Sequence, residues 1–254
     1  MPPQLTPPPL PGDQVGQYLL GDMLGVGGMA TVYRATSTDH GRVALKVLHP
    51  GKAGTEEDRR FRREFLALEG LRHPGIVAVH EHGRHGDYPW FAMELVDGMD
   101  LGTLLERWSE DNPVDRFERV ERILTALCDA LAYVHDQGLI HRDLKPSNVL
   151  VDAQGRAKLT DFGVVKAPGG QFTTQLTVAG KLVGTVAFMA PEQITGDEVD
   201  ARADLYSLGA VLYGMLTGTR PIVADSIAGY LARHLTEDPV PPSEHDPRIP
   251  RRLE

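Results

Sequence analysis

The chain contains a single cysteine, Cys128, among its 254 residues. One cysteine excludes a disulfide within the chain and fits a reducing compartment, so we expect a cytoplasmic location. The surrounding stretch, "ILTALCDALAYV", is expected to be helical, which favours a buried thiol over a reactive one.

Long apolar runs and an excess of positive charge are also lacking. The longest apolar stretches, 123–134 and 205–216, are shorter than the ~20 residues that a membrane-spanning helix needs. No apolar export signal follows Met1. The chain has 26 basic and 35 acidic residues and a net charge of −9, so it has no general attraction to nucleic acid or anionic lipid. We therefore expect no nucleic-acid partner and no membrane span in this segment.

Proline is abundant only at the start, where it occupies positions 2, 3, 7, 8, 9 and 11. We expect residues 1–14 to form a disordered, unpacked tail. A ligand for a proline-binding domain is the alternative interpretation.

Hydrophobic periodicity divides the rest of the chain into two regions. In residues 15–96, five strand-like stretches and an amphipathic helix at 56–71 predict an antiparallel five-stranded sheet with one helix. Residues 97–254 are mainly helical, with one helix over 116–137 that Gly138 ends. A second helix, about 202–218, is apolar on nearly every side and should be buried. The predicted fold class is α+β.

A glycine-rich stretch, "GVGGMATV" at residues 25–32, lies between two predicted strands. Glycines let the backbone approach a ligand closely and expose N–H groups to phosphate oxygens. A plain hairpin turn explains the stretch equally well. A dinucleotide-binding fold is disfavoured because a strand, and not a helix, should follow the glycines.

Lys46 places a charge within the apolar strand "VALKVL". Such a lysine could point to solvent, or it could contact phosphates if a carboxylate held it in place. Glu64 is the preferred partner because apolar residues flank it on the inward side of the helix at 56–71, whereas Glu69 falls on the charged side.

Dense polar groups occupy "HRDLKPSNVL", residues 141–150, which leads into a short strand. Asp143 and Asn148 lie in this stretch, and "TDFG" supplies Asp161 after another strand. Asp and Asn are common turn formers. Combined with the glycines and the lysine, however, they supply what phosphoryl transfer requires: oxygen ligands for Mg²⁺, cations for phosphate and a carboxylate base.

These motifs give the chain a family resemblance. From about Gln17 to Leu235 it resembles the eukaryotic-like protein kinases, through an ordered Gly-rich loop, "VALK", "HRD", "DFG" and "APE". "GVGGMATVY", "DFGVVKA" and "FMAPEQ" look like the bacterial serine/threonine branch. The resemblance implies a bilobal fold, with an N-lobe at 15–96 and a C-lobe at 97–254, and activity with ATP and Mg²⁺ on a protein serine or threonine.

By this resemblance, Asp143 would deprotonate the substrate hydroxyl, Asn148 and Asp161 would bind Mg²⁺, and Lys145 would steady the transferred group. Lys46, paired with Glu64, would contact the α- and β-phosphates. The nucleotide would also be contacted by the Gly-rich loop, an apolar slot and the strand that follows, namely by Leu24, Gly25, Val26, Gly27, Gly28, Met29, Ala30, Thr31, Val32, Ala44, Met93, Glu94, Val96 and Leu150. Ala30 replaces the third glycine of the family pattern, which should reduce flexibility slightly.

Three further residues are implied by the same resemblance. Thr185, before the "APE" segment, and Lys145 look like the serine/threonine pattern, which disfavours tyrosine kinases. The "APE" segment itself disfavours small-molecule phosphotransferases, which usually lack it. Asp204 would anchor the "HRD" backbone, and Glu192 would pair with an arginine that this family carries beyond residue 250.

The chain stops at "RIPRRLE", where we would expect further helices of the C-lobe. Apolar area left uncovered costs about 25 cal/mol per Å² relative to burial. We therefore expect this segment alone to be poorly stable or to aggregate, and a sharp, reversible melt at high temperature would contradict that. The alternative function is a catalytically impaired fragment or pseudokinase that binds ATP and acts by docking.

By the same resemblance, control by phosphorylation is expected at Thr177, with Thr173 and Thr174 as neighbours, because protein kinases with an arginine in the position of Arg142 often use it to bind a phosphothreonine. The alternative is that these threonines only suit a mobile loop. A dimer would allow such autophosphorylation. Replacing Thr173, Thr174 and Thr177 together by alanine should lower activity, because no phosphate could then pair with Arg142. Full activity of that triple variant in a phosphoryl-transfer assay would refute the hypothesis.

Overall fold

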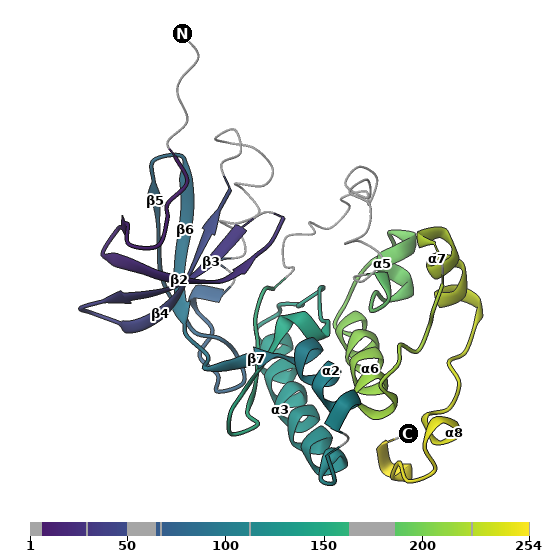
Figure 1. Cartoon of the computed structure of the whole chain (residues 1–254). Coiled ribbons are helices and arrows are strands. Elements are labelled where there is room, and N and C mark those ends of the chain that lie inside the picture. The colour runs from purple at the N-terminus through teal and green to yellow at the C-terminus, as the bar shows by residue number, and fades with distance from the viewer. Residues whose placement is uncertain are drawn as a thin grey trace. The chain divides into compact units, whose positions relative to one another are not determined.

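The computed structural model describes residues 7–28, 30–49, 65–66, 68–111, 113–162, 186–224 and 226–253. These residues form two compact units, one ending at Asp97 and the other beginning at Gly98. The first unit is built on a sheet and the second is mainly helical, as Figure 1 shows. No described helix is long and apolar enough to cross a membrane.

The first unit contains a six-stranded antiparallel sheet in the order β1-β2-β3-β4-β6-β5. The five predicted strands are all present, and a two-residue strand, β1, is added at one edge. The strands are β1 (Gln14–Val15), β2 (Tyr18–Val26), β3 (Ala30–Ser37), β4 (Gly41–Leu48), β5 (Val79–His85) and β6 (Tyr88–Glu94). Of the predicted helix at 56–71, the described residues 65, 66, 68 and 69 are helical, and Phe65 and Leu68 are buried as expected.

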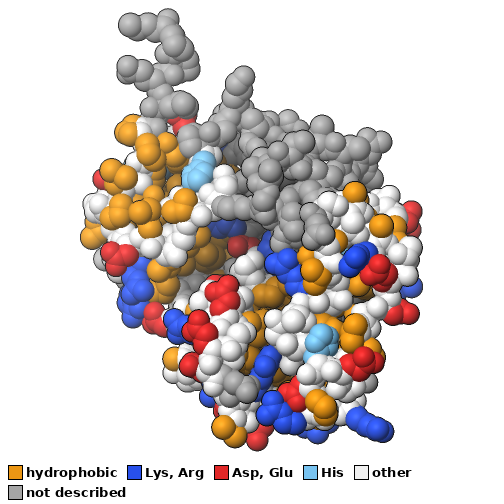
Figure 2. Space-filling view, turned by 45° about the vertical axis from the view of Figure 1, so that its right-hand side comes forward, with side chains coloured by type: hydrophobic (Ala, Val, Ile, Leu, Met, Phe, Trp, Pro, Cys, Tyr) orange, Lys and Arg blue, Asp and Glu red, His pale blue; other side chains and the backbone are white. Residues whose placement is uncertain are grey.

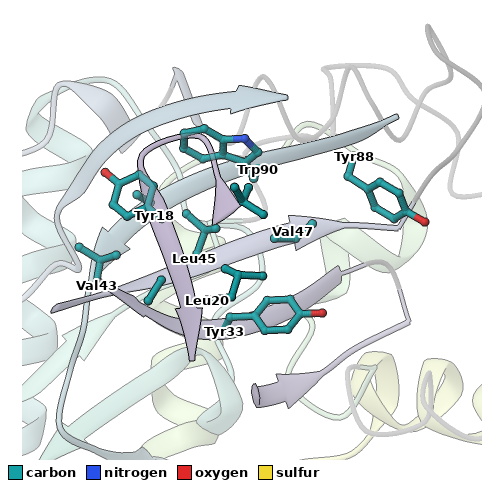
Figure 3. Close-up of a cluster of buried hydrophobic side chains, with 11 residues drawn as sticks. Tyr18, Leu20, Tyr33, Val43, Leu45, Val47, Tyr88 and Trp90 are labelled. Atoms are coloured by element: carbon teal, nitrogen blue, oxygen red, sulfur yellow. The ribbon is translucent and has the colours of Figure 1, made fainter. Parts of the chain in front are cut away.

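One face of this sheet carries an apolar core. Because side chains alternate along a strand, Val43, Leu45 and Val47 of β4 share a face, and they pack with Tyr18 and Trp90 (Figure 3). The rings of Tyr18 and Trp90 meet edge to face with centroids 5.6 Å apart. Lys46, with the opposite alternation, lies on the other face.

The proline-rich start is packed further than expected. Pro9 is buried, and its carbonyl accepts a hydrogen bond from the Tyr33 hydroxyl at 2.8 Å. The backbone of Gly12 also donates to Leu20, and that of Leu20 donates to Asp13, each at 2.9 Å. The expected unpacked tail at 1–14 therefore differs from the structure at residues 9–14, because a proline carbonyl can still accept a hydrogen bond although proline has no N–H.

The second unit packs helices around a small three-stranded sheet in the order β7-β8-β9. Its strands are β7 (Gly98–Asp100), β8 (Val149–Asp152) and β9 (Ala157–Leu159). Its helices are α2 (Leu101–Asp111), α3 (Arg116–Asp136), η1 (Pro146–Asn148), α5 (Pro191–Thr195), α6 (Arg202–Thr217), α7 (Ile227–Thr236), α8 (Pro242–His245) and η2 (Arg251–Leu253).

The two long helices of this unit match their predicted limits. Gly138 follows α3 with φ 70°, and Gly218 caps α6 with φ 74°, both in the left-handed region that favours glycine. Most of α6 is buried, but Leu205 and Tyr206 are exposed.

The prediction of a buried Cys128 is wrong, because Leu127, Ala130 and Leu131 occupy the inward face of α3 and leave Cys128 exposed. Partial desolvation and the neighbouring Asp129 raise the pKa of its thiol, which still disfavours a reactive thiolate.

Apolar side chains also reach the surface of the first unit, in orange at the upper left of Figure 2. The large exposed ones in β2 are Leu19, Met23, Leu24 and Val26. Two of these, Leu24 and Val26, were expected to cover a nucleotide.

Candidate active site

The first unit aligns several predicted nucleotide-binding residues by strand register. Val32 of β3 lies directly across from Gly25 of β2 on one side and from Lys46 of β4 on the other. In the same sheet Ala44 pairs with Met93 of β6. Paired residues of an antiparallel sheet share a face. The face opposite the apolar core therefore carries Val32, Ala44, Lys46 and Met93.

Lys46 is half-buried, with its ammonium 5.5 Å from the centroid of the Phe91 ring. A cation over an aromatic face is attracted by the ring quadrupole, which orients the lysine along this face of the sheet. Its predicted partner Glu64 lies outside the described residues. The competing Glu69 is exposed, as the charged side of its helix requires.

The Gly-rich stretch forms the β2–β3 hairpin. The backbone N–H of Gly27 donates to the Ala30 carbonyl at 2.8 Å, and a Cβ at Gly27 would lie 3.3 Å from that oxygen. Leu24 is 43% exposed and Val26 is 64% exposed. The Thr31 hydroxyl lies 3.0 Å from Nε2 of His49, whereas Met29 is outside the described residues. Both the phosphate-loop and the plain-hairpin interpretations fit this turn.

The remaining predicted nucleotide contacts are divided between the units. Glu94 ends β6, where its backbone N–H donates to the Ala78 carbonyl at 2.8 Å, and Val96 is half-buried beyond it. In the second unit, Leu150 of β8 pairs with Asp100. Asp100 accepts hydrogen bonds from the Thr103 N–H at 3.1 Å and the Thr103 hydroxyl at 2.7 Å, so it caps α2.

The second unit brings together the polar residues of the 141–150 stretch. The ammonium of Lys145 lies 2.8 Å from Oδ2 of Asp143. Nδ2 of Asn148 donates to the same carboxylate oxygen at 3.0 Å and to the Asp143 carbonyl at 2.8 Å. Two donors thus fix the Asp143 carboxylate, which is a quarter exposed at 24% and can still be reached from solvent.

The orientation of Asn148 leaves its oxygen on the side away from Asp143. Nδ2 also donates to the Asp161 carbonyl at 3.4 Å, while Oδ1 receives a long 3.5 Å hydrogen bond from the Ser147 hydroxyl. The side chain of Asn148 thus contacts the backbone of Asp161, so a residue with an amide oxygen and a residue with a carboxylate lie next to each other. Oxygen donors of this kind are the ligands that Mg²⁺ prefers, so the donor set fits the metal predicted from the sequence.

Asp204 anchors the backbone ahead of Asp143. Its carboxylate is fully buried and accepts the backbone N–H groups of His141 and Arg142, each at 2.8 Å. Nε2 of His135 lies 2.8 Å from the same carboxylate. Arg142 has a φ of 64°, and only it and Asp161 of the described non-glycine residues have a positive φ. Such a conformation is strained for a residue with a side chain and persists only where the surroundings hold it.

His141 lies in the interior of this loop. Its Nδ1 accepts the Asp143 N–H at 3.3 Å, so the proton of the neutral ring is on Nε2, 3.2 Å from the Thr160 carbonyl. The ring also packs 4.4 Å from that of Phe162. Desolvation by complete burial lowers the pKa of His141, which keeps the imidazole neutral.

Two side chains of this network were not predicted from the sequence, His135 at the end of α3 and Gln193 on α5. Gln193 donates through Nε2 to the Arg142 carbonyl at 2.9 Å. Gln193 ends the "FMAPEQ" motif, but neither that motif nor any other assigns a chemical role to Gln193 or His135, so only the folded contacts reveal them. Glu192 is half-buried on α5. The predicted Thr173, Thr174, Thr177 and Thr185 lie outside the described residues.

Comparison with known families explains why this fold and these polar residues occur together. Residues 18–244 match the protein kinase domain family. The chain belongs to this family. Protein kinases generally use ATP and Mg²⁺ and act on protein substrates, and the bilobal kinase fold agrees with the sheet and the helical unit described above.

The relatives place the chain in the bacterial serine/threonine branch. It is 40% identical over 246 residues to the serine/threonine-protein kinase PknB of Mycobacterium leprae, covering 94% of this chain and 38% of that protein. It is 41% identical over 242 residues to the probable serine/threonine-protein kinase SCO3848 of Streptomyces coelicolor, covering 92% of this chain and 35% of that protein. The chain thus spans little more than a third of these curated relatives.

A solved structure agrees with these relatives. The Mycobacterium tuberculosis PknI kinase domain matches with a TM-score of 0.70 and 30% identity, covering 95% of this chain and 87% of that domain.

The neutral His141 predicts a pH dependence of stability. Below the ordinary histidine pKa of 6.5 the unfolded chain binds a proton that the folded chain does not, so stability falls as the pH falls. His141→Asn has no imidazole at this position, so this loss of stability is absent. Below pH ~6.5 the free energy of unfolding of the wild type should therefore fall by up to about 1.4 kcal/mol per pH unit relative to that of the variant. Urea unfolding between pH 5 and 7.5 measures the difference.

The matched control for this measurement is His85→Asn, on β5 of the first unit, which should keep the wild-type slope. Equal pH slopes for wild type and His141→Asn would contradict a buried, neutral imidazole.

Proposed function

We propose that the chain is a serine/threonine protein kinase domain, which transfers the γ-phosphoryl group of ATP to a protein hydroxyl. The observation that carries this proposal is the Asp143 carboxylate, held by Lys145 at 2.8 Å and by Asn148 at 3.0 Å. Family membership and bacterial serine/threonine relatives support the same reaction class.

Asp143 and Lys145 divide the work at the reacting centre. One oxygen of Asp143 is committed to Lys145 and Asn148, so the carboxylate has a fixed orientation in which it accepts the proton of a serine or threonine hydroxyl. The Lys145 ammonium beside it neutralises charge on the transferred phosphoryl group. Lys145 and Thr185 favour serine or threonine over tyrosine as acceptor, and the "APE" segment favours a protein over a small molecule.

Nucleotide and metal would be held by residues from both units. Oδ1 of Asn148 and the carboxylate of Asp161 would hold Mg²⁺, which neutralises phosphate charge when bound. Lys46, paired with Glu64, and the backbone of the Gly-rich loop from Leu24 to Thr31, with Met29 among its residues, would bind the phosphates. Val32, Ala44 and Leu150 would enclose the adenine, with Met93 at the back and hydrogen bonds from the backbone between Glu94 and Val96.

Regulation and location complete the proposal. Autophosphorylation of Thr177, or of Thr173 or Thr174, would create a phosphate for Arg142 and raise activity, and a dimer would bring two chains together for that step. Asp204 and Glu192 would serve as structural anchors, and the domain would act in the cytoplasm in bacterial signalling.

Asp143→Asn tests the assignment most simply. The amide keeps the size and the loop contacts but cannot accept the hydroxyl proton, so phosphoryl transfer should fall at least about 100-fold. Transfer of labelled phosphate from ATP to a generic basic protein measures this, and MgATP binding should be retained.

The control variant is Asp129→Asn, which removes the same charge from the exposed side of α3 and should keep full activity. Undiminished transfer by Asp143→Asn would exclude Asp143 as the base. A wild-type chain that binds ATP without transferring phosphate would instead favour a docking module.

A further inference from the structure

Gln193 joins two backbone groups that are far apart in the chain. It lies on α5, is only 3% exposed, and accepts the Ala190 N–H through Oε1 at 3.1 Å. Its Nε2 donates to the Arg142 carbonyl at 2.9 Å, across a separation of 51 residues. Because one partner is a donor and the other an acceptor, the orientation of the amide is fixed by its contacts.

The Arg142 carbonyl belongs to the peptide group that leads into Asp143. Arg142 itself is in the left-handed region, with φ 64°, and its N–H is held by Asp204 of α6 at 2.8 Å. Gln193 of α5 holds its carbonyl. Both peptide groups that flank this strained residue are therefore fixed by buried side chains, each from a different helix.

The two bonds of Gln193 have different chemical requirements. Accepting the Ala190 N–H is the return half of a capping box, a task that glutamate performs as well as glutamine. Donating to the Arg142 carbonyl requires an N–H, which an ionised glutamate lacks. The hydrogen bond to the Arg142 carbonyl, which requires glutamine, can therefore be tested separately from the capping of α5.

We propose that Gln193 is a positioning residue for the phosphoryl-transfer reaction. By holding the Arg142 carbonyl it sets the backbone from which the Asp143 carboxylate projects, and it links that carboxylate to α5 of the "APE" segment. This inference rests on the proposed kinase activity. Gln193 does not touch substrate or nucleotide in this account, so it acts on turnover and not on ATP binding.

Gln193→Glu and Gln193→Met separate this role from helix capping. At pH 8 the ionised carboxylate of Gln193→Glu still accepts the Ala190 N–H and so keeps the cap, but its second oxygen repels the Arg142 carbonyl. We expect kcat of Gln193→Glu to fall about tenfold, with the KM for ATP changed by less than about twofold. Gln193→Met loses both bonds and should be at least as slow.

The pH profile supplies a readout that a merely structural role would not move. Burial raises the pKa of a glutamate above its usual value of about 4.3, so the side chain of Gln193→Glu becomes a donor as the pH is lowered. Its kcat relative to wild type should therefore recover toward pH 6, whereas Gln193→Met stays slow at every pH. Gln154→Glu, on an exposed loop, is the matched control and should follow the wild type.

Amide hydrogen exchange at Asp143 distinguishes failure of this inference from failure of the proposed function. The Asp143 N–H donates to Nδ1 of His141 at 3.3 Å and reports on the same peptide group without any turnover. It should exchange faster in Gln193→Glu at pH 8 and regain protection at lower pH, even if the wild type transfers no phosphate. Wild-type exchange and wild-type kcat in Gln193→Glu at pH 8 would overturn the positioning role.

Discussion

The geometry of the catalytic loop depends on one buried carboxylate. Asp204 has no exposed surface, and a buried charge is costly unless hydrogen bonds compensate it. Here the compensation comes from the N–H groups of His141 and Arg142 and from the ring of His135. The same bonds hold Arg142 in its left-handed conformation, so satisfying the carboxylate also sets the backbone from which Asp143 projects.

Around this anchor, each neighbouring element adds one constraint. Asn148, at the end of η1, reaches both Asp143 and the backbone of Asp161. His141 joins Asp143 to Thr160, and Gln193 joins Arg142 to α5. The base and the oxygen donors for a metal are therefore positioned by one network of hydrogen bonds within the second unit, whereas Lys46 and the Gly-rich hairpin are positioned by strand register in the first.

Local sequence signals predicted much of this organisation. Gly138 marked the end of α3 because the left-handed region favours glycine, and hydrophobic periodicity located the five predicted strands of the first unit. Ordered motifs singled out Asp143, Lys145 and Asn148, and the fold brings these three side chains together.

Such local signals could not predict contacts between residues that are far apart in the chain. His135 lies 69 residues from Asp204, and Gln193 lies 51 residues from Arg142. For the same reason the packing of Pro9 against Tyr33 was missed. The central claim, that Asp204 holds the loop, is tested most directly by amide exchange in Asp204→Asn, whose single side-chain oxygen cannot replace both acceptors. The account predicts exchange at His141 and Arg142 faster by about tenfold to a hundredfold, with Leu45 in the first unit unchanged, whereas wild-type protection of both amides would contradict it.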